Sequence, residues 1–207
     1  MQLAMKVRNK IRACLQAYGP EKIKMRLWDT EFSQGRWDCL DTTPGDCVYS
    51  YIEKSANGGS ILDLGCGSGS TATELGASTY RDYTGIDIST VAISKARKKT
   101  EDRGRADKNR FVQSDVITYT PTQQFDVILF RDSIYYIPRA QIISVFDRYS
   151  KYLKHNGVFI VRIWDGSGKC KTIIDNIDKN FQIVEKHLSE GSKTTVLVFR
   201  QQPNSGK

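Results

Sequence analysis

Three aspartates that lie at or near the ends of short apolar segments are well placed to bind a ligand. Asp63 leads into a glycine-rich segment, Gly65-Cys-Gly67-Ser-Gly69, while Asp87 and Asp115 end the next two apolar segments. Glycines let the backbone turn sharply and approach a ligand that a Cβ atom would exclude. A glycine-rich turn between a strand and a helix often cradles a nucleotide, and a carboxylate after the next strand can accept both ribose hydroxyls. Because Asp63 would repel a pyrophosphate, we expect a ligand with an amino-acid end and no phosphate.

The elements that must position these residues alternate between strands and helices from residue 60 onward. Short apolar runs predict strands, and amphipathic runs between them predict helices. Single intervening helices favour a parallel sheet with right-handed crossovers. The last two strands are joined by the tight Glu190-Gly-Ser192 turn, so one of them must run antiparallel. The expected strands cover residues 60–64, 83–88, 110–114, 125–130, 157–164, 181–187 and 194–199, with helices expected at 71–76, after Ser89 and near Pro138.

Residues 1–57 are expected to form an N-terminal helical lid, and residues 58–207 the domain that contains the sheet. Apolar residues recur at helical spacing until Gly19-Pro20 ends the first helix. The other side of this helix is basic, which would also suit a helix lying on a membrane surface, but we expect it to pack on its own domain. Its apolar stripe comprises Leu3, Val7, Ile11, Cys14 or Leu15, and Tyr18.

The rest of the lid is less regular. Arg26 to Asp41 is rich in aromatic residues and shows no clear period. Thr43 and Pro44 predict a capped helix start, with Asp46 as the partner of the cap. Asn57-Gly-Gly59 ends that helix.

Four ordered segments resemble the motifs of the class I S-adenosylmethionine-dependent methyltransferases. They are Ile61–Ser70, Thr84–Ser89, Phe111–Val116 and Phe125–Pro138, and His155–Val161 is similar to the family's turn into its fifth strand. The resemblance implies a Rossmann-like three-layer α/β sandwich. Its seven-stranded, mostly parallel sheet would have the order 3-2-1-4-5-7-6, with strand 7 antiparallel. It also implies S-adenosylmethionine as cofactor and S-adenosylhomocysteine as product.

The same resemblance implies which residues contact the cofactor. Asp87 would bind the ribose hydroxyls, Asp115 would contact the adenine amino group, and Cys66 would face the cofactor with its backbone. The residues expected to bind the cofactor are Trp37, Asp63, Gly65, Cys66, Gly67, Asp87, Ile88, Asp115, Val116 and Arg131.

Methyl transfer from a sulfonium is an in-line displacement, so the acceptor must be held opposite the leaving sulfur and water must be excluded. Aromatic faces suit the cationic sulfonium; the candidates are Trp28, Trp37, Tyr135, Tyr136 and Trp164. An oxygen or nitrogen acceptor often needs a base, and the expected catalytic residues are Tyr136, Asp132 and Asp165. Tyr136 stands where many relatives carry histidine. Arg131 could hold an acidic substrate, and Arg36 could reach the cofactor carboxylate.

The preferred function is O- or N-methylation of a small molecule, and three alternatives stay open to different degrees. The net charge of +8 would suit RNA, which keeps an RNA methyltransferase open. A non-catalytic S-adenosylmethionine-binding subunit is the second alternative. A nicotinamide-dependent dehydrogenase is disfavoured by Asp63, by Ser70 and by the missing fingerprint glycine. No Asn/Asp-Pro-Pro-Tyr type sequence ends the fourth strand, and no appended RNA-binding module is visible.

The composition narrows the cellular setting. Five cysteines without a Cys-x-x-Cys pair and only two histidines argue against a disulfide framework and against a metal site. No apolar run is long enough to span a bilayer or resembles a signal-peptide core. We therefore expect a cytoplasmic protein.

Overall fold

One seven-stranded sheet forms the centre of the molecule. The computed structural model describes residues 2–41, 43–166, 168–189, 191 and 193–202, with side chains from residue 7 onward, so Glu190 and Ser192 of the expected turn lie outside the described residues. The strand order β3-β2-β1-β4-β5-β7-β6 confirms the expected order. β7 runs antiparallel to both of its neighbours, as expected. The strands are β1 (Ser60–Leu64), β2 (Asp82–Asp87), β3 (Asn109–Gln113), β4 (Phe125–Arg131), β5 (Leu153–Trp164), β6 (Phe181–Ser189) and β7 (Thr194–Gln201).

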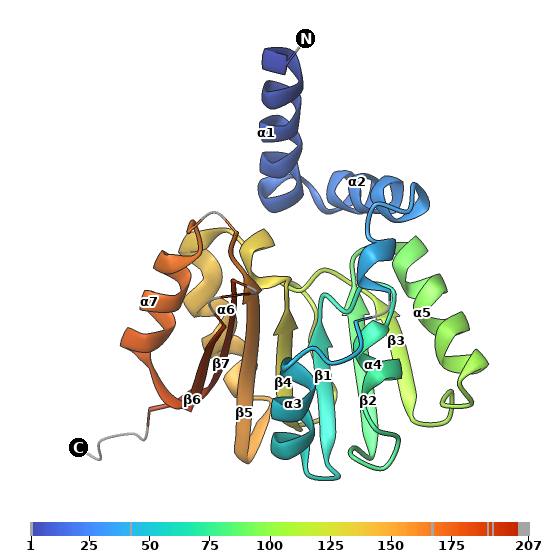
Figure 1. Ribbon diagram of the computed structural model, residues 1–207, viewed down its shortest axis with the longest axis vertical. Coiled ribbons are helices and arrows are strands. Elements are labelled where there is room, and N and C mark those ends of the chain that lie inside the picture. Colours follow the sequence, from blue (N-terminus) through green and yellow to red (C-terminus); the bar gives the residue numbers. More distant parts are fainter. Residues whose placement is uncertain (1, 42, 167, 190, 192, 203–207) are drawn as a thin grey trace.

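Helices cover both faces of the sheet and complete the three layers (Figure 1). α3 (Val48–Ala56), α4 (Ser70–Glu74) and α5 (Thr90–Asp102) pack on one face, while α6 (Ile142–Ser150) and α7 (Lys171–Asn180) pack on the other. Successive residues of a strand point to opposite faces. Ile61 therefore joins one core and Leu62 the other, and both are fully buried. This two-sided burial explains why the strands read as continuous apolar runs.

Phe146 of α6 holds the C-terminal hairpin on the parallel strands. Its ring lies 5.1–5.4 Å from the ring centroids of Phe130, Phe159, Phe181 and Phe199, which come from β4, β5, β6 and β7. All four contacts are close to edge-to-face, a geometry that aromatic pairs prefer. One helix residue thus ties four strands together.

Two sequence predictions about helices need correction. The helix expected to start at Thr43-Pro44 begins instead at Val48, whose backbone amide donates to Asp46 Oδ1 at 3.1 Å. The Thr43 hydroxyl is not free to cap this helix, because it accepts from the Arg131 guanidinium at 2.7 Å and bonds the Tyr49 hydroxyl at 2.6 Å. α7 was not expected at all.

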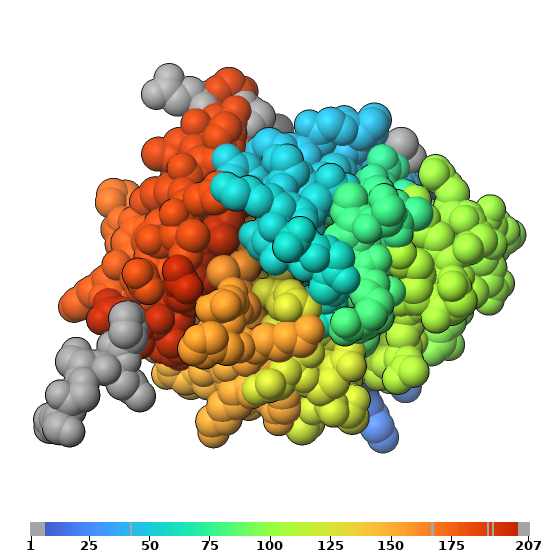
Figure 2. Space-filling view, turned by 90° about the horizontal axis from the view of Figure 1, so that it is seen from below, coloured from blue at the N-terminus to red at the C-terminus, as the bar shows by residue number. Residues whose placement is uncertain are grey.

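α1 (Gln2–Tyr18), α2 (Glu21–Ser33) and the short 3-10 helix η1 (Asp38–Leu40) lie beyond the carboxyl ends of the parallel strands, and α1 projects away from the body (Figure 1). α3 belongs to the helical layer instead, where it contacts β4 and β5, and in Figure 2 this part of the chain lies next to the red C-terminal part. Within residues 1–57, α2 and η1 thus lie at the strand ends, whereas α1 extends away from them. No described helix is long and apolar enough to cross a membrane.

The expectation that α1 packs its apolar stripe on its own domain is wrong. The exposed fractions of Val7, Ile11 and Tyr18 are 49%, 56% and 67%, and Cys14 is also exposed. From Val7 onward the stripe points into solvent, and the side chain of Leu3 lies outside the described part of the structure.

Candidate functional site

A pocket lies at the carboxyl ends of the strands, where the chain order reverses between β1 and β4, the usual place for a ligand in such sheets. It contains about 1050 Å³ of empty space, a volume that includes the solvent in its open mouth. All ten residues expected to bind a cofactor line it, and so do Asp132 and Tyr136. The other lining residues are Gln16, Lys24, Trp28, Phe32, Leu40, Ser68, Ser70, Thr71, Ile117, Ser133 and Ile137.

The glycine loop forms the floor of the pocket. Gly65 and Gly67 have φ values of +85° and +54°, a backbone conformation that side chains with a Cβ atom seldom adopt. Asp87 fixes the loop from the end of β2. Its Oδ2 accepts from the Gly67 amide at 3.0 Å, and its Oδ1 accepts from the Ser89 amide at 2.9 Å. Burial nevertheless raises the pKa of the Asp87 carboxyl to about 6.

Asp63 is buried at the end of β1 with one oxygen unsatisfied. Its Oδ2 accepts from the Tyr83 hydroxyl at 2.5 Å, whereas its Oδ1 has no hydrogen-bond partner among the residues that the structure describes. Burial raises the pKa of this carboxyl to about 6. A buried carboxylate oxygen without a donor is costly, and Asp63 lines the pocket. This oxygen therefore fits a positively charged or hydrogen-bond-donating group of a ligand, such as an amino-acid ammonium.

Asp115 faces a residue that the sequence analysis did not single out. Its Oδ2 forms an ion pair with the Lys24 ammonium of α2, and its Oδ1 accepts from the Ile117 amide at 2.9 Å. Both side chains of the ion pair are largely buried. The spacing of Lys24, Trp28 and Phe32 by four residues places all three on one side of α2, and this pattern could have revealed them.

Aromatic rings from the lid and from the loop after β4 form one wall of the pocket. The Trp28 ring lies 4.7 Å from that of Tyr136, edge to face, and 5.8 Å from that of Trp37. Tyr136 belongs to the 3-10 helix η2 (Ile134–Tyr136), which a second one, η3 (Arg139–Gln141), follows. Burial raises the pKa of the Tyr136 phenol. This side chain therefore stays protonated at neutral pH and can donate a hydrogen bond, but it cannot serve as a base.

Glu31, which the sequence analysis also did not single out, fixes the aromatic wall from behind. Its carboxylate is buried and accepts from Trp37 Nε1 at 2.9 Å and from Gln16 Nε2 at 3.0 Å. It also forms ion pairs with Arg12 at 3.2 Å and with Arg36 at 3.4 Å. Through these contacts, Glu31 ties the C-terminal part of α1 and the Trp37 ring to α2.

A group of buried charges lies beneath the wall at the ends of β4 and β5. Arg131 and Arg162 both form ion pairs with Asp46, at 3.1 and 3.2 Å. Asp132 forms an ion pair with Arg162 and accepts from the Trp164 amide at 3.0 Å. Its φ of +55° is unusual for a residue with a side chain. Burial raises the pKa of the Asp132 carboxyl, against the lowering effect of the two arginines.

Some expected residues lie elsewhere. Asp165 does not line the pocket, and its carboxylate accepts from the Lys169 and Cys170 amides at 3.0 and 2.7 Å, just before α7. Trp164 is 56% exposed, and Tyr135 packs on Tyr136 at 4.9 Å without lining the pocket. Arg36 is bound to Glu31 and does not line the pocket either.

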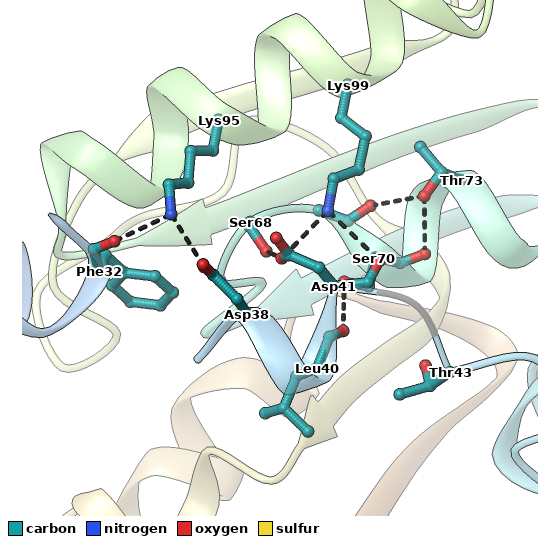
Figure 3. A network of polar contacts seen from close by, with 12 residues as sticks. Phe32, Asp38, Leu40, Asp41, Thr43, Ser68, Ser70, Thr73, Lys95 and Lys99 are labelled. Carbon is teal, nitrogen blue, oxygen red and sulfur yellow. Dashed lines mark hydrogen bonds and ion pairs between the residues drawn. The ribbon is translucent and has the colours of Figure 1, made fainter. Parts of the chain in front are cut away.

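The serines of the glycine loop hold the lid (Figure 3). Ser68 donates to the Asp41 carboxylate, and the Ser70 hydroxyl donates to the Leu40 carbonyl at 2.6 Å. Lys99 of α5 pairs with Asp41 at 3.1 Å. Ser70, which stands where a dinucleotide fingerprint has glycine, thus uses its hydroxyl to fasten the end of η1 over the loop.

No group of three or more potential metal ligands occurs in the described part of the chain. The polar side chains that line the pocket include four aspartates, the cations Lys24 and Arg131, and the amide of Gln16.

Comparison with known proteins gives a consistent result. Residues 61–157 match a family model described as a methyltransferase domain. A sterol 24-C-methyltransferase of Gibberella zeae is 31% identical over 105 residues, which are 50% of this chain and 27% of that protein. A ubiquinone biosynthesis O-methyltransferase of Actinobacillus pleuropneumoniae is 32% identical over 147 residues, which are 67% of this chain and 59% of that protein. The chain thus spans less than two thirds of the length of these relatives.

Among solved structures, the N-methyltransferase NodS from Bradyrhizobium japonicum in complex with S-adenosyl-L-homocysteine has a similar fold. The TM-score is 0.69 at 18% identity, and the match covers 86% of this chain and 98% of the other.

Proposed function

We propose that the chain is a class I S-adenosylmethionine-dependent methyltransferase that transfers a methyl group to an oxygen or nitrogen atom of a small-molecule acceptor. The match of residues 61–157 to a methyltransferase domain and the likeness to curated methyltransferases support this proposal. S-adenosylmethionine is the cofactor of this family and supplies, when bound, an electrophilic methyl group on a sulfonium. The observation that carries the proposal is the unsatisfied, buried Oδ1 of Asp63 in the wall of a pocket that also holds Asp87 and Asp115.

We assign the cofactor half of the pocket to these three aspartates. Asp63 would bind the ammonium of the methionyl end, which would satisfy its free oxygen. Asp87, already fixed by two backbone amides, would accept from the ribose hydroxyls. Asp115 would accept from the adenine amino group. The Lys24 ammonium would then either share the Asp115 carboxylate with the adenine or lose this ion pair.

The acceptor half would lie between the aromatic wall and the loop after β4. Trp28, Trp37 and Tyr136 offer flat apolar surfaces that suit an aromatic or alicyclic acceptor and shield the reaction from water. The curated relatives, named for sterol and ubiquinone biosynthesis, support a small-molecule acceptor.

Two of the three expected catalytic residues remain candidates for contact with the acceptor. Tyr136 stays protonated and is suited to hold the acceptor by a hydrogen bond. Asp132 is suited to receive the acceptor's proton, since its carboxylate lines the pocket and keeps free lone pairs beside its two donors. Asp165, outside the pocket, is not included in this proposal.

Calorimetry and a labelled-methyl assay test the proposal. S-adenosylmethionine should bind and NAD should not, and extract fractions should contain a small molecule that accepts the label. In that assay Asp132→Asn should lower turnover by about 100-fold or more while cofactor affinity changes little. Asp165→Asn, the same change outside the pocket, is the control. Any change in its turnover should be matched by an equal change in its cofactor affinity. Binding of NAD in place of S-adenosylmethionine would contradict the cofactor assignment. Binding of S-adenosylmethionine without transfer of its methyl group to any acceptor would indicate a non-catalytic subunit.

A further inference from the structure

The outer side of α1 carries an apolar stripe that nothing in the described chain covers. Val7, Ile11, Cys14 and Tyr18 follow one another at spacings of four, three and four residues, which places them on one side of a helix. Three of them are 49%, 56% and 67% exposed, and Cys14 is exposed as well. The helix projects from the body, so the stripe is accessible along its length (Figure 1).

α1 is anchored to the lid by its polar side. Gln16 and Arg12 both contact the buried Glu31 carboxylate, at 3.0 and 3.2 Å. At 100° per residue, Gln16 lies about half a turn around the helix from Val7 and Tyr18. A surface helix normally buries its apolar stripe and exposes its polar side. In α1 this arrangement is reversed, which indicates that the stripe has another partner.

The charge of α1 indicates what this partner is. The helix contains four basic residues and no acidic one, and Arg8 and Lys10, which flank the stripe, are exposed. An apolar stripe with basic flanks is the pattern of a helix that lies in the interface of an anionic lipid surface. A second copy of α1 fits less well, because its like charges would repel. The stripe is also only about 17 Å long, whereas a stable interface buries about 800 Å² on each partner.

We propose that α1 docks the protein on an anionic lipid surface, with Val7, Ile11 and Tyr18 inserted below the headgroups and Arg8 and Lys10 among them. Gln16 lines the pocket, so docking by α1 would hold the pocket close to the lipid. The proposal concerns the outer side of α1 alone, and vesicle binding does not depend on whether methyl transfer is found.

Flotation of the full chain with lipid vesicles tests this proposal. The protein should float with vesicles that contain phosphatidylglycerol and stay unbound with pure phosphatidylcholine, and high salt should reduce flotation. Ile11→Asp should weaken vesicle binding by about tenfold or more, because it removes an apolar side chain that would be buried in the lipid. The double change Arg8→Gln and Lys10→Gln should weaken it by about fivefold per charge.

Ala13→Asp is the matched control. It adds the same charge to the same helix, at an exposed position about 160° around the helix from Ile11, so it should cost much less binding than Ile11→Asp. Circular dichroism and S-adenosylmethionine calorimetry should show that both variants are folded. Equal losses for the two variants, or no flotation with either kind of vesicle, would overturn the proposal. A dimer in light scattering that Ile11→Asp converts to a monomer would identify a second copy as the partner instead.

Discussion

Asp63 and Asp87 illustrate at the scale of single residues how a buried carboxylate prepares a site for a cation or for hydroxyl donors. Burial raises the pKa of both to about 6, from an ordinary value of 3.8. An acid whose pKa is raised by folding stabilises the protein below its unfolded pKa, and this contribution is lost as the pH rises through the folded pKa. At neutral pH both carboxylates are therefore ionised at a cost to stability. A ligand that supplies donors would offset this cost.

The first prediction concerns the pH dependence of cofactor binding. Because an ammonium binds the ionised form of Asp63, S-adenosylmethionine affinity should fall as the pH drops through about 6, by up to about tenfold per pH unit. Calorimetry between about pH 7.5 and about pH 5 measures this change. Asp63→Asn, which cannot ionise, should bind weakly at every pH and show a flatter profile. A profile as steep as that of the unmodified protein in this variant would show that another group controls the effect.

The second prediction concerns Asp87. Asp87→Ala removes the acceptor proposed for the ribose hydroxyls and also releases the Gly67 amide, so S-adenosylmethionine affinity should fall by about 10- to 100-fold. Asp87→Asn should show whether the charge or the loop support matters more, because it keeps one acceptor for the loop. Asp82→Ala, at the partly exposed start of the same strand, is the control and should leave the affinity unchanged. Unchanged affinity in Asp87→Ala would remove this residue from the site.

At the scale of elements, α2 shows why the lid was harder to predict than the sheet. A core helix carries an apolar stripe, whereas α2 turns Lys24, Trp28 and Phe32 toward a pocket and buries the charged Glu31. For this reason the aromatic segment Arg26 to Asp41 shows no clear helical period in the sequence. The central strands β1 and β4 were predictable because two-sided burial makes them nearly continuous apolar runs, whereas the edge strand β6 alternates between buried or half-buried and exposed residues.

The missed helix α7 accounts for the misplaced Asp165. A residue at the end of β5 is expected at the ligand edge of the sheet, and Asp165 was predicted to be catalytic for that reason. The carboxylate instead binds the Lys169 and Cys170 amides at the entry to α7. In contrast, all ten expected cofactor contacts line the pocket. Nine of them lie at the ends of β1 to β4 or directly after them, and Trp37 comes from the segment before η1. The residues that were missed, Lys24 and Glu31, come from the lid.

The third prediction tests how α2 is attached to α5. Asp29 accepts from the Ser89 hydroxyl at 2.7 Å, the Thr90 hydroxyl at 3.0 Å and the Val91 amide at 3.2 Å, so it acts as a cap supplied by another helix. Asp29→Ala should lower the free energy of unfolding by about 1–2 kcal/mol, measured by urea denaturation. Glu21→Ala, an exposed acid at the start of α2, should change it by less than about 0.5 kcal/mol. Equal effects would mean that the cap contributes little.

At the scale of the whole molecule, part of the positive charge is engaged within the chain, while other cations such as Arg8 and Lys10 are exposed. Several basic side chains of the region after β2 bind backbone carbonyls: Arg97 that of Phe111 at 2.7 Å, and Arg105 that of Leu75 at 2.7 Å. Lys95 and Lys99 bind the lid, and Arg131 and Arg162 are buried with aspartates. These cations brace loops and the lid. They do not form an open surface of the kind that tracks a phosphate backbone.

The fourth prediction follows from this distribution and addresses the RNA alternative. A nucleic-acid site needs several cations that can each neutralise a phosphate, and affinity then falls steeply with salt, with a log–log slope of about −0.7 per phosphate for single strands. Because these lysines and arginines are engaged, the chain should bind single-stranded RNA only weakly. The RNA should dissociate at about 0.15 M salt, and the log–log slope of affinity against salt should be shallower than about −2. Fluorescence anisotropy over a salt series measures this slope. A slope of about −4 or steeper, with binding maintained at that salt concentration, would favour an RNA acceptor over a small molecule.

The engaged cations would then have to leave their carbonyl and carboxylate partners when RNA binds. In that case Asp41→Asn, which releases Lys99, should strengthen RNA retention.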